Sequence, residues 1–300
     1  MAWTVDGKTI LITGASRGMG FEAGLALARL GARVVLVGRD RARTDAAVDA
    51  VRSRTGARAT SYLCDFSSQA SIRELAASVR RDHPVLHVLV NNAGCVQKRR
   101  TITVDGIETT FATNHLGYFL LTNLLLDIVK ASAPARIVTV ASIGHRSGTI
   151  HFEDLGFEHG YGILKAYSQS KLANVLFAAE LARRLDGTGV TSNSVHPGSV
   201  DTNIWTGTPL WTKPIIAVLL RPWFITAEAG GATIVQLAAS EELEGVTGRY
   251  FEKQKPVAPS SKAQDEATAR RLWDVSARLV ERPPPTGFAP SRPNFHHDRP

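Results

Sequence analysis

Cysteine is nearly absent from this 300-residue sequence, which contains only Cys64 and Cys95. Two thiols are too few for a disulfide framework and indicate a reducing compartment, so we expect a cytoplasmic protein. Long apolar runs are also missing, since runs such as those at residues 119–121 and 215–220 fall far short of the roughly 20 residues that span a bilayer. The first residues show no basic stretch followed by an apolar one. We therefore expect neither a secretion signal nor a transmembrane segment.

Acidic residues are fewer than basic ones, which gives a net charge of +8 and a pI near 9.8. The basic residues come in scattered pairs, such as Arg80-Arg81 and Arg183-Arg184, within helical patterns that also carry acidic or apolar residues. This distribution is typical of a solvated surface and differs from the basic stripe of a nucleic-acid-binding protein. We expect no nucleic acid partner.

Apolar runs rich in Val, Ile and Leu alternate with amphipathic stretches along most of the chain. They predict strands at residues 9–13, 33–37, 60–63, 87–90, 136–140 and 191–195, and helices at 19–30, 40–54, 71–81, 110–131, 167–185 and 227–239. Strands that are apolar on both faces and alternate with helices indicate a parallel sheet covered on both sides. The predicted fold is therefore α/β, a three-layer α/β/α Rossmann-type domain with a doubly wound parallel sheet, in one domain over residues 1–282.

Two regions depart from this pattern. Residues 205–225 are apolar and aromatic but contain three prolines, which suits a lid over an apolar ligand, a membrane-contacting patch or a segment of core. Residues 283–300 are rich in proline without an apolar period, so we predict a disordered tail.

A glycine-rich turn, TGASRGMG at residues 13–20, joins the first predicted strand to the first helix. Gly14 permits a tight turn, Gly18 lets the backbone approach a pyrophosphate, and Gly20 lets the helix pack closely on the sheet. The phosphates would meet the positive end of the helix that begins near Met19. The spacing Gly-x-x-x-Gly-x-Gly differs from the common dinucleotide fingerprint, and a simple tight connection is the alternative.

The end of the second strand decides which nicotinamide dinucleotide fits. Arg39 occupies that end, and Arg17 in the glycine turn can approach the same point; two guanidinium groups suit the 2′-phosphate of NADP. We therefore favour NADP over NAD. A shift of one residue would place the carboxylate of Asp40 there instead, which would suit the ribose hydroxyls of NAD.

The next two strand ends carry further candidates. Asp65 follows the third strand, where it can accept a hydrogen bond from the adenine amino group or serve as a turn or helix-capping residue. Asn92, Ala93 and Gly94 follow the fourth strand, and their small and amide side chains let the backbone pass close to a bound ring.

Tyr167 and Lys171 lie four residues apart in YSQSK, which places them on one face of a helix. Taken alone, the pair is typical of an exposed aromatic ring packed on a lysine stem. An ammonium within about 4–6 Å, however, favours the phenolate and makes a phenol with a pKa near 10 a usable acid or base. Hydride transfer to or from carbon needs such a group beside the substrate oxygen.

The motifs TGASRGMG, NNAG, Asn114, Ser142, Tyr167-x-x-x-Lys171 and HPG at 196–198 occur in the order and approximate spacing of the short-chain dehydrogenase/reductase family. The sequence resembles this family from about residue 6 to residue 280. The stretches ASIGH, IHFEDL and AYSQSKLANVLFAAELARRL are similar to the retinol dehydrogenase-like branch. That resemblance implies NADP and lipophilic substrates such as retinoids or steroids; we expect no N-terminal anchor like that of the membrane-bound members.

The resemblance assigns roles to four residues. Tyr167 would be the general acid/base, Lys171 its cation, and Ser142 a hydrogen-bond donor to the developing oxyanion. Asn114 would hold a water that links Lys171 to solvent. A turn serine and a plain polar helix position are the alternatives for Ser142 and Asn114.

The predicted catalytic residues are thus Asn114, Ser142, Tyr167 and Lys171. The predicted cofactor contacts are Gly14, Ser16, Arg17, Gly18, Met19, Gly20, Arg39, Asp65, Phe66, Asn92, Ala93, Gly94, Tyr167, Lys171, Pro197, Gly198, Val200 and Thr202.

The interval of 25 residues between Ser142 and Tyr167 is longer than is usual in the family and contains His145, His151 and His159. Their spacing fits no metal motif, so we expect these histidines to face solvent or a substrate, and no metal. Relatives often pair through the helices that hold Asn114 and Tyr167, which implies a homodimer or homotetramer.

The sequence thus predicts an NADP-dependent oxidoreductase that interconverts a carbonyl and an alcohol on a lipophilic small molecule. Two alternatives remain: a non-catalytic NADP(H)-binding or sensing module, and a reductase of a carbon–carbon double bond.

Overall fold

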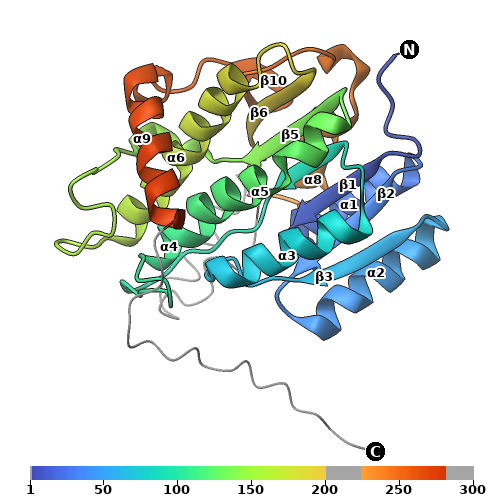
Figure 1. Cartoon of the computed structure of the whole chain (residues 1–300), viewed down its shortest axis with the longest axis horizontal. Helices are drawn as coiled ribbons and strands as arrows, with labels where there is room; N and C mark the ends of the chain where they lie inside the picture. Colours follow the sequence, from blue (N-terminus) through green and yellow to red (C-terminus); the bar gives the residue numbers. More distant parts are fainter. Residues whose placement is uncertain (1, 201–223, 282–300) are drawn as a thin grey trace, which may run out of the picture.

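The structure is a computed structural model, and it describes residues 2–200 and 224–281 (Figure 1). Within these residues one sheet of eight strands has the order β10-β9-β6-β5-β4-β1-β2-β3. Its strands are β1 (Thr9–Thr13), β2 (Arg33–Gly38), β3 (Ala59–Leu63), β4 (Val88–Asn91), β5 (Ala135–Val140), β6 (Val190–His196), β9 (Tyr250–Glu252) and β10 (Lys255–Val257). Neighbours pair in parallel except β9 and β10, which are antiparallel.

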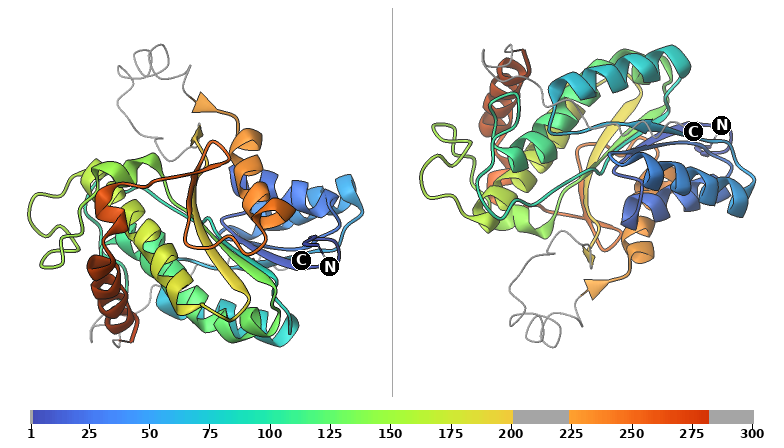
Figure 2. Two further views of the ribbon diagram at one scale, coloured as in Figure 1. Left: turned by 90° about the horizontal axis from the view of Figure 1, so that it is seen from above. Right: turned by 90° about the horizontal axis from the view of Figure 1, so that it is seen from below.

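Helices cover both faces of the sheet (Figure 2). One face carries α1 (Gly18–Arg29), α2 (Arg41–Thr55) and α8 (Ala227–Ala239). The other carries α3 (Gln69–Asp82), α5 (Gly117–Ala131) and α6 (Ile163–Arg184), with α9 (Glu266–Glu281) packed on the outer side of α5 and α6. Among the described residues, no helix combines the length and apolar character needed to cross a membrane.

The shorter elements lie mostly in the connections. They are α4 (Thr109–Phe111), the π-helical turn η1 (Ala112–Leu116), the 3-10 turns η2 (Ile143–Ser147), η6 (Glu241–Leu243) and η7 (Ser261–Gln264), and the paired strands β7 (Ser199–Val200) and β8 (Phe224–Ile225).

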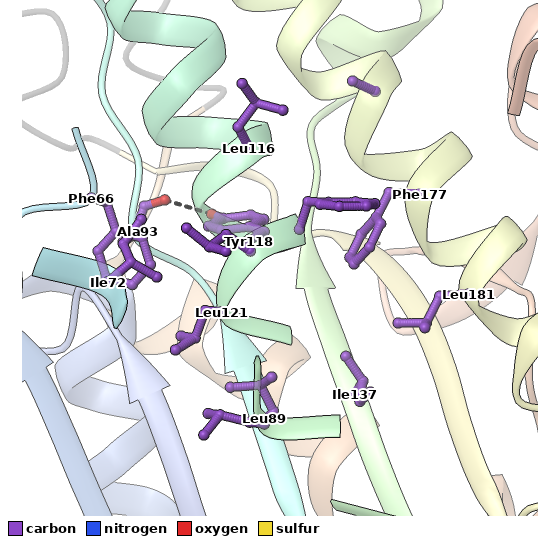
Figure 3. Packing of buried hydrophobic residues seen from close by; sticks show 14 of the residues in the cluster. Phe66, Ile72, Leu89, Ala93, Leu116, Tyr118, Leu121, Ile137, Phe177 and Leu181 are labelled. Carbon is purple, nitrogen blue, oxygen red and sulfur yellow. Dashed lines mark hydrogen bonds between the residues drawn. The ribbon is translucent and has the colours of Figure 1, made fainter. Parts of the chain in front are cut away.

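The core forms because the central strands are apolar on both sides. In β1 the side chain of Leu11 joins the cluster under α3, α5 and α6, whereas Ile10 and Ile12 join the cluster under α1, α2 and α8. Figure 3 shows the first cluster, in which Leu89 and Ile137 of the sheet face the helices. Each strand thus contributes alternate residues to two apolar layers.

This architecture confirms the predicted three-layer, doubly wound α/β fold. The chain leaves β3 at one edge and returns to β4 on the opposite side of β1, so the order of winding reverses between β1 and β4. Ligands of open α/β sheets bind at the carboxyl ends of the strands at such a reversal. The strand order therefore places the candidate binding site where the glycine turn follows β1.

Several element boundaries differ from the prediction. The helix predicted at 110–131 is divided by the π turn η1, and the helix that holds Tyr167 begins earlier, at Ile163. β9, β10 and α9 are not among the predicted elements. The predicted tail at 283–300 and residues 205–223 of the predicted lid lie outside the described residues.

Candidate active site at the carboxyl edge of the sheet

The glycine turn packs directly against the segment that follows β4. Gly14 has a φ of +66°, and a Cβ added there would lie 2.7 Å from Ala93 Cα. A Cβ on Gly20 would lie 2.5 Å from Asn92 Nδ2. Gly18, with a φ of +63°, has no heavy atom within 4 Å of its Cβ position in the part of the chain that the structure describes. Gly14 and Gly20 thus close the turn on its inner side, and Gly18 leaves its outer side open.

The amino end of α1 is suited to an anion. Asp40, Ser68 and Thr226 cap α2, α3 and α8 with side-chain hydrogen bonds. Over the described residues, α1 has no side-chain cap and no acidic residue in its first turn. Its first N–H groups and the positive end of its dipole are therefore available to a phosphate.

Asn92 holds the turn in place. Its Nδ2 donates to the carbonyl oxygens of Thr13 (2.7 Å) and Gly14 (3.2 Å). In return, the Thr13 hydroxyl accepts hydrogen bonds from the backbone N–H groups of Asn92 (2.8 Å) and Ala93 (2.9 Å). Thr13 is a supporting residue absent from the predicted site, although it opens the TGASRGMG motif. The amide of Asn92 therefore ties the glycine turn to the segment that follows β4.

The end of β2 lies beside the glycine turn. A Cβ on Gly38 would be 3.1 Å from Ser16 Cβ, and Arg39 follows Gly38 directly with an exposed side chain. Arg17 is exposed as well. Neither guanidinium lies within 4 Å of a carboxylate in the described ranges 2–200 and 224–281, so both are available to an anionic ligand.

Asp40, the alternative residue at this position, has another role. Its Oδ1 accepts a hydrogen bond from Arg43 N (2.9 Å) at the start of α2, and its Oδ2 pairs with Arg43 Nη2 (2.9 Å). The side-chain hydrogen bond from Arg43 is the main cause that lowers the pKa of Asp40. The carboxylate is thus engaged in capping α2.

The residues after β3 have mainly structural contacts. Asp65 Oδ1 accepts hydrogen bonds from Ser67 N (2.9 Å) and Ser67 Oγ (2.7 Å), which is the geometry of a turn aspartate. The Phe66 side chain lies in the core, close to Gly117 (Figure 3). The adenine contact of Asp65 stays a prediction, and Phe66 can reach a cofactor only through its backbone.

The last group of predicted cofactor residues follows β6. Gly198 has a φ of +97°, and a Cβ there would overlap the Ile225 side chain. Pro197 is buried next to it, and the backbone of Val200 belongs to β7. Thr202 lies outside the described residues.

Asn114 sits in the π turn between α4 and α5, fully buried. Its amide binds both polar groups of the Cys95 backbone, accepting from N at 2.8 Å and donating to O at 3.0 Å. The same Nδ2 donates to Ser170 Oγ at 3.0 Å. Asn114 therefore links the loop after β4 to α6, next to Lys171. π turns are frequent at functional sites.

Ser142 and Tyr167 are hydrogen-bonded to each other. Ser142 follows β5, and its Oγ also accepts from Gly144 N at 3.1 Å. Burial raises the pKa of Tyr167, and the hydrogen bond with Ser142 lowers it by less. The phenol therefore holds its proton at neutral pH.

Lys171 is buried one turn after Tyr167, with 5% of its surface exposed. Its Nζ donates to the carbonyl of Val140 at 3.1 Å and lies 5.7 Å from the centroid of the Tyr167 ring. Burial lowers the pKa of Lys171 to about 8. The amine and the phenol thus lie at the carboxyl end of β5, at the sheet edge that also carries the glycine turn.

One further residue missing from the predicted site supports this edge. The Tyr118 hydroxyl donates to the Ala93 carbonyl at 2.6 Å (Figure 3). Tyr118 is fully buried in α5, so this bond holds the NNAG segment against the core. A tyrosine within an apolar helical pattern is the only signal that could have indicated it.

The histidines between Ser142 and Tyr167 differ in placement. His151 and His159 are exposed and border a hollow of about 360 Å³ in the long connection. His145 is completely buried, so the expectation that it faces solvent or substrate is wrong. In the ranges that the structure describes, no three His, Cys, Asp or Glu side chains are grouped to hold a metal ion.

Sheet topology and site chemistry together define a class, the nicotinamide-nucleotide-dependent oxidoreductases with a doubly wound fold. The sequence model of the family described as short chain dehydrogenase matches residues 8–212. The chain belongs to this family, whose members are NAD(P)-dependent and act on alcohols or carbonyls.

Sequence relatives place it in the retinol dehydrogenase-like branch. It is 44% identical over 289 residues to retinol dehydrogenase 14 of Mus musculus, and the matched region covers 92% of this chain and 86% of that relative. It is 43% identical over 283 residues to retinol dehydrogenase 13 of Homo sapiens, where the matched region covers 92% of this chain and 86% of that relative.

Solved structures show the same fold. A protein of Mycobacterium paratuberculosis matches with a TM-score of 0.74 and 32% identity, over 95% of this chain and 100% of that one. RhlG of Pseudomonas aeruginosa, solved as an active-site complex with NADP, matches with a TM-score of 0.67 and 27% identity. The match covers 83% of this chain and 95% of that one.

Proposed function

We propose that this protein is an NADP-dependent oxidoreductase that interconverts a carbonyl and an alcohol on a lipophilic small molecule, with Tyr167 as general acid/base. The observation that carries the proposal is the joint placement of Ser142, Tyr167 and Lys171 at the sheet edge that bears the glycine turn. A positioned proton donor beside a nucleotide crevice is what hydride exchange with a carbonyl requires.

Tyr167 is set up to donate a proton. Burial keeps the phenol protonated, so during reduction it can give its proton to the alkoxide oxygen as charge develops there. Ser142 can donate a second hydrogen bond to the same oxygen. NADPH, when bound, supplies the hydride, and its oxidised form adds positive charge beside the phenol.

Lys171 supports the phenolate that remains. With a pKa of about 8, most of its amine is charged at neutral pH, and the charge lies within one helical turn of Tyr167. The prediction that Lys171 lowers the Tyr167 pKa is wrong for the chain alone, because burial raises this pKa and the smaller lowering comes from the hydrogen bond with Ser142. The cation therefore acts mainly after proton transfer, when the negative charge of the phenolate is present.

The polar groups of the crevice fit NADP. The open side of Gly18 and the uncapped end of α1 suit the pyrophosphate, and Arg17 and Arg39 suit the 2′-phosphate. The commitment of Asp40 to α2 supports NADP over NAD, because no other acidic residue follows β2 at this position.

The amide nitrogen of Asn114 is engaged with Cys95 and Ser170, and its Oδ1 accepts one hydrogen bond from Cys95 N. The water that would link Lys171 to solvent stays a prediction, and the remaining acceptor site of Oδ1 can bind it. The side chain keeps this turn in position.

Exposed apolar side chains support a lipophilic substrate. Ile143, 39% exposed, follows Ser142, and Ile163 (37%) and Leu164 (65%) open the helix that carries Tyr167 one turn later. Apolar surface of this kind beside polar catalytic groups is typical of a small-molecule site. The names of the retinol dehydrogenase relatives point to the same chemical class.

The test is a screen of lipophilic aldehydes and ketones with NADPH and NADH, followed by identification of the products. We expect NADPH-dependent formation of alcohols. Reduction of a carbon–carbon double bond with the carbonyl left intact would replace the proposed reaction, and NADPH binding without turnover over the whole panel would favour the binding module.

A further inference from the structure

The carbonyl group of Ser142 is held by the buried residue three positions later. Ser142 O accepts a hydrogen bond from His145 N at 3.1 Å and makes a second, shorter contact of 2.8 Å with His145 Nδ1. Ser142 Oγ has other partners, Gly144 N and the Tyr167 hydroxyl. The orientation of the serine thus depends on the imidazole behind it.

The other nitrogen of the ring settles which atom carries the proton. Ser260 N lies 3.1 Å from His145 Nε2, and a backbone N–H can only donate. Nε2 must therefore accept, which leaves the hydrogen on Nδ1, where it donates to Ser142 O. Burial lowers the pKa of His145, in keeping with a neutral ring.

The segment that supplies Ser260 also contacts the turn after Ser142 through Arg146. Arg146 Nη2 donates to Ala258 O at 3.3 Å and lies 3.6 Å from a carboxylate oxygen of Glu252. The His145 ring itself packs on Tyr250, with centroids 4.6 Å apart. His145 is thus clamped between the catalytic strand end and the segment at 250–260.

We propose that His145 is a positioning residue for Ser142, acting as a neutral Nδ1–H imidazole that bridges the Ser142 carbonyl and the Ser260 N–H group. The proposal rests on the proposed function, because it assigns Ser142 to the substrate oxygen. It adds a residue that touches neither substrate nor cofactor and sets the direction of one that does.

The tautomer is tested without any turnover. In the cofactor-free protein with ¹⁵N-labelled histidine, the signals that disappear in His145→Phe belong to His145. We expect a protonated Nδ1 and an unprotonated Nε2 at neutral pH. An Nε2–H tautomer or an imidazolium would overturn the proposal.

The positioning role is tested by two substitutions at 145. His145→Phe keeps a ring on Tyr250 and removes both nitrogens, whereas His145→Asn places an amide nitrogen where Nδ1 was. We expect kcat to fall about 10-fold or more in the Phe variant, to recover in large part in the Asn variant, and KM for NADPH to stay within about twofold in both. Equal losses in the two variants, or a folded Phe variant with unchanged kcat, would contradict it.

Ser260 gives a matched pair in case the histidine variants unfold. Its φ of −61° and ψ of 156° are compatible with proline, so Ser260→Pro removes the N–H group and places a ring carbon against His145 Nε2, whereas Ser260→Ala removes only the hydroxyl. We expect a loss of kcat in the proline variant alone. Equal kcat values for the two would refute the bridge.

A control and one further comparison separate the possible failures. His87→Gln alters a histidine at the opposite, amino end of β4, where it accepts from Thr9 N, and should leave kcat unchanged. If Tyr167→Phe keeps full turnover, the proposed function fails, and the NMR result still decides the state of His145.

Discussion

At the scale of single residues, the site depends on how burial changes two titrating groups in α6. Burial raises the pKa of Tyr167 and lowers that of Lys171 to about 8. Burial disfavours the charged form of each group, yet at neutral pH the two differ: Tyr167 keeps its proton and is neutral, whereas most of the Lys171 amine is still charged. In the chain alone, Tyr167 is therefore protonated at neutral pH, which is the form that carbonyl reduction needs.

Burial of Lys171 has a consequence for stability. In the unfolded chain its pKa is near 10.5, and in the folded protein it is about 8. Between these pH values the unfolded chain binds more protons, so this group makes the free energy of unfolding rise with pH from about 8 to about 10.5. We expect Lys171→Met to lack this rise. Urea unfolding of the cofactor-free wild type and of Lys171→Met between pH 8 and 10.5 measures the free energy of unfolding of each. If the difference between the two free energies did not change with pH, the lowered pKa of Lys171 would be contradicted.

Arg39 should decide between the two nicotinamide dinucleotides. Arg39→Asp removes a charge-assisted contact to the 2′-phosphate and adds repulsion, so we expect KM for NADPH to rise about 10- to 100-fold while KM for NADH changes little. Steady-state kinetics with both cofactors measures this. Arg41→Asp, two residues along at the exposed start of α2, is the matched control for charge alone. Equal effects on the two cofactors would place the 2′-phosphate elsewhere.

At the scale of elements, α9 closes the apolar face of α5 and α6. Its Trp273 ring stacks on Phe177 at 5.8 Å, meets Phe119 edge to face at 4.9 Å, and is covered by the Arg184 guanidinium at 4.3 Å. Ser276 of the same helix binds His115 in the π turn at 2.9 Å. α9 thus supports the element that holds Asn114.

Removal of the Trp273 ring should weaken this packing strongly. We expect Trp273→Ala to lower the free energy of unfolding by about 3 kcal/mol, because the packing of a large, partly buried ring on Phe119 and Phe177 is lost. The exposed neighbour Asp274 is the control, since Asp274→Ala should change it by less than about 0.5 kcal/mol. Urea denaturation compares the two. Similar values would mean that α9 contributes little to the fold.

The elements show what sequence patterns can and cannot indicate. The central strands were predictable because Ile10, Leu11 and Ile12 are apolar on both faces, whatever their neighbours. The π turn was not predictable, because the apolar period at 110–131 is unbroken. Its side-chain hydrogen bonds from Asn114 to Cys95 and Ser170 form only in the folded chain. α9 does carry a signal, since its buried positions recur at intervals of three and four residues.

The same distinction applies to the site. The strand-end positions of Ser142 and Arg39 follow from the order of the strands, so they were accessible from sequence. The roles of Asp40, Phe66 and His145 were not accessible from sequence, because each depends on a partner in the folded chain. Asp40 binds Arg43, Phe66 packs against Gly117, and His145 accepts from Ser260 N.

At the scale of the whole molecule, two surfaces bear on assembly and substrate entry. The expected pairing through α5 and α6 would meet α9, because Trp273 covers the part of that face around Phe119 and Phe177. The opposite end of α6 presents Ile163 and Leu164 beside the site. The molecule thus covers one apolar surface with its own helix and leaves the surface next to Tyr167 exposed.

The central claim is that Tyr167 exchanges a proton with the substrate oxygen. The most direct measurement is the single-turnover rate of NADPH oxidation by a carbonyl substrate, in wild type and in Tyr167→Phe, with NADPH binding checked by fluorescence. Removal of the hydroxyl alone should leave NADPH affinity within about twofold and lower the rate about 100-fold or more. A Phe variant that binds NADPH and oxidises it at the wild-type rate would contradict the account.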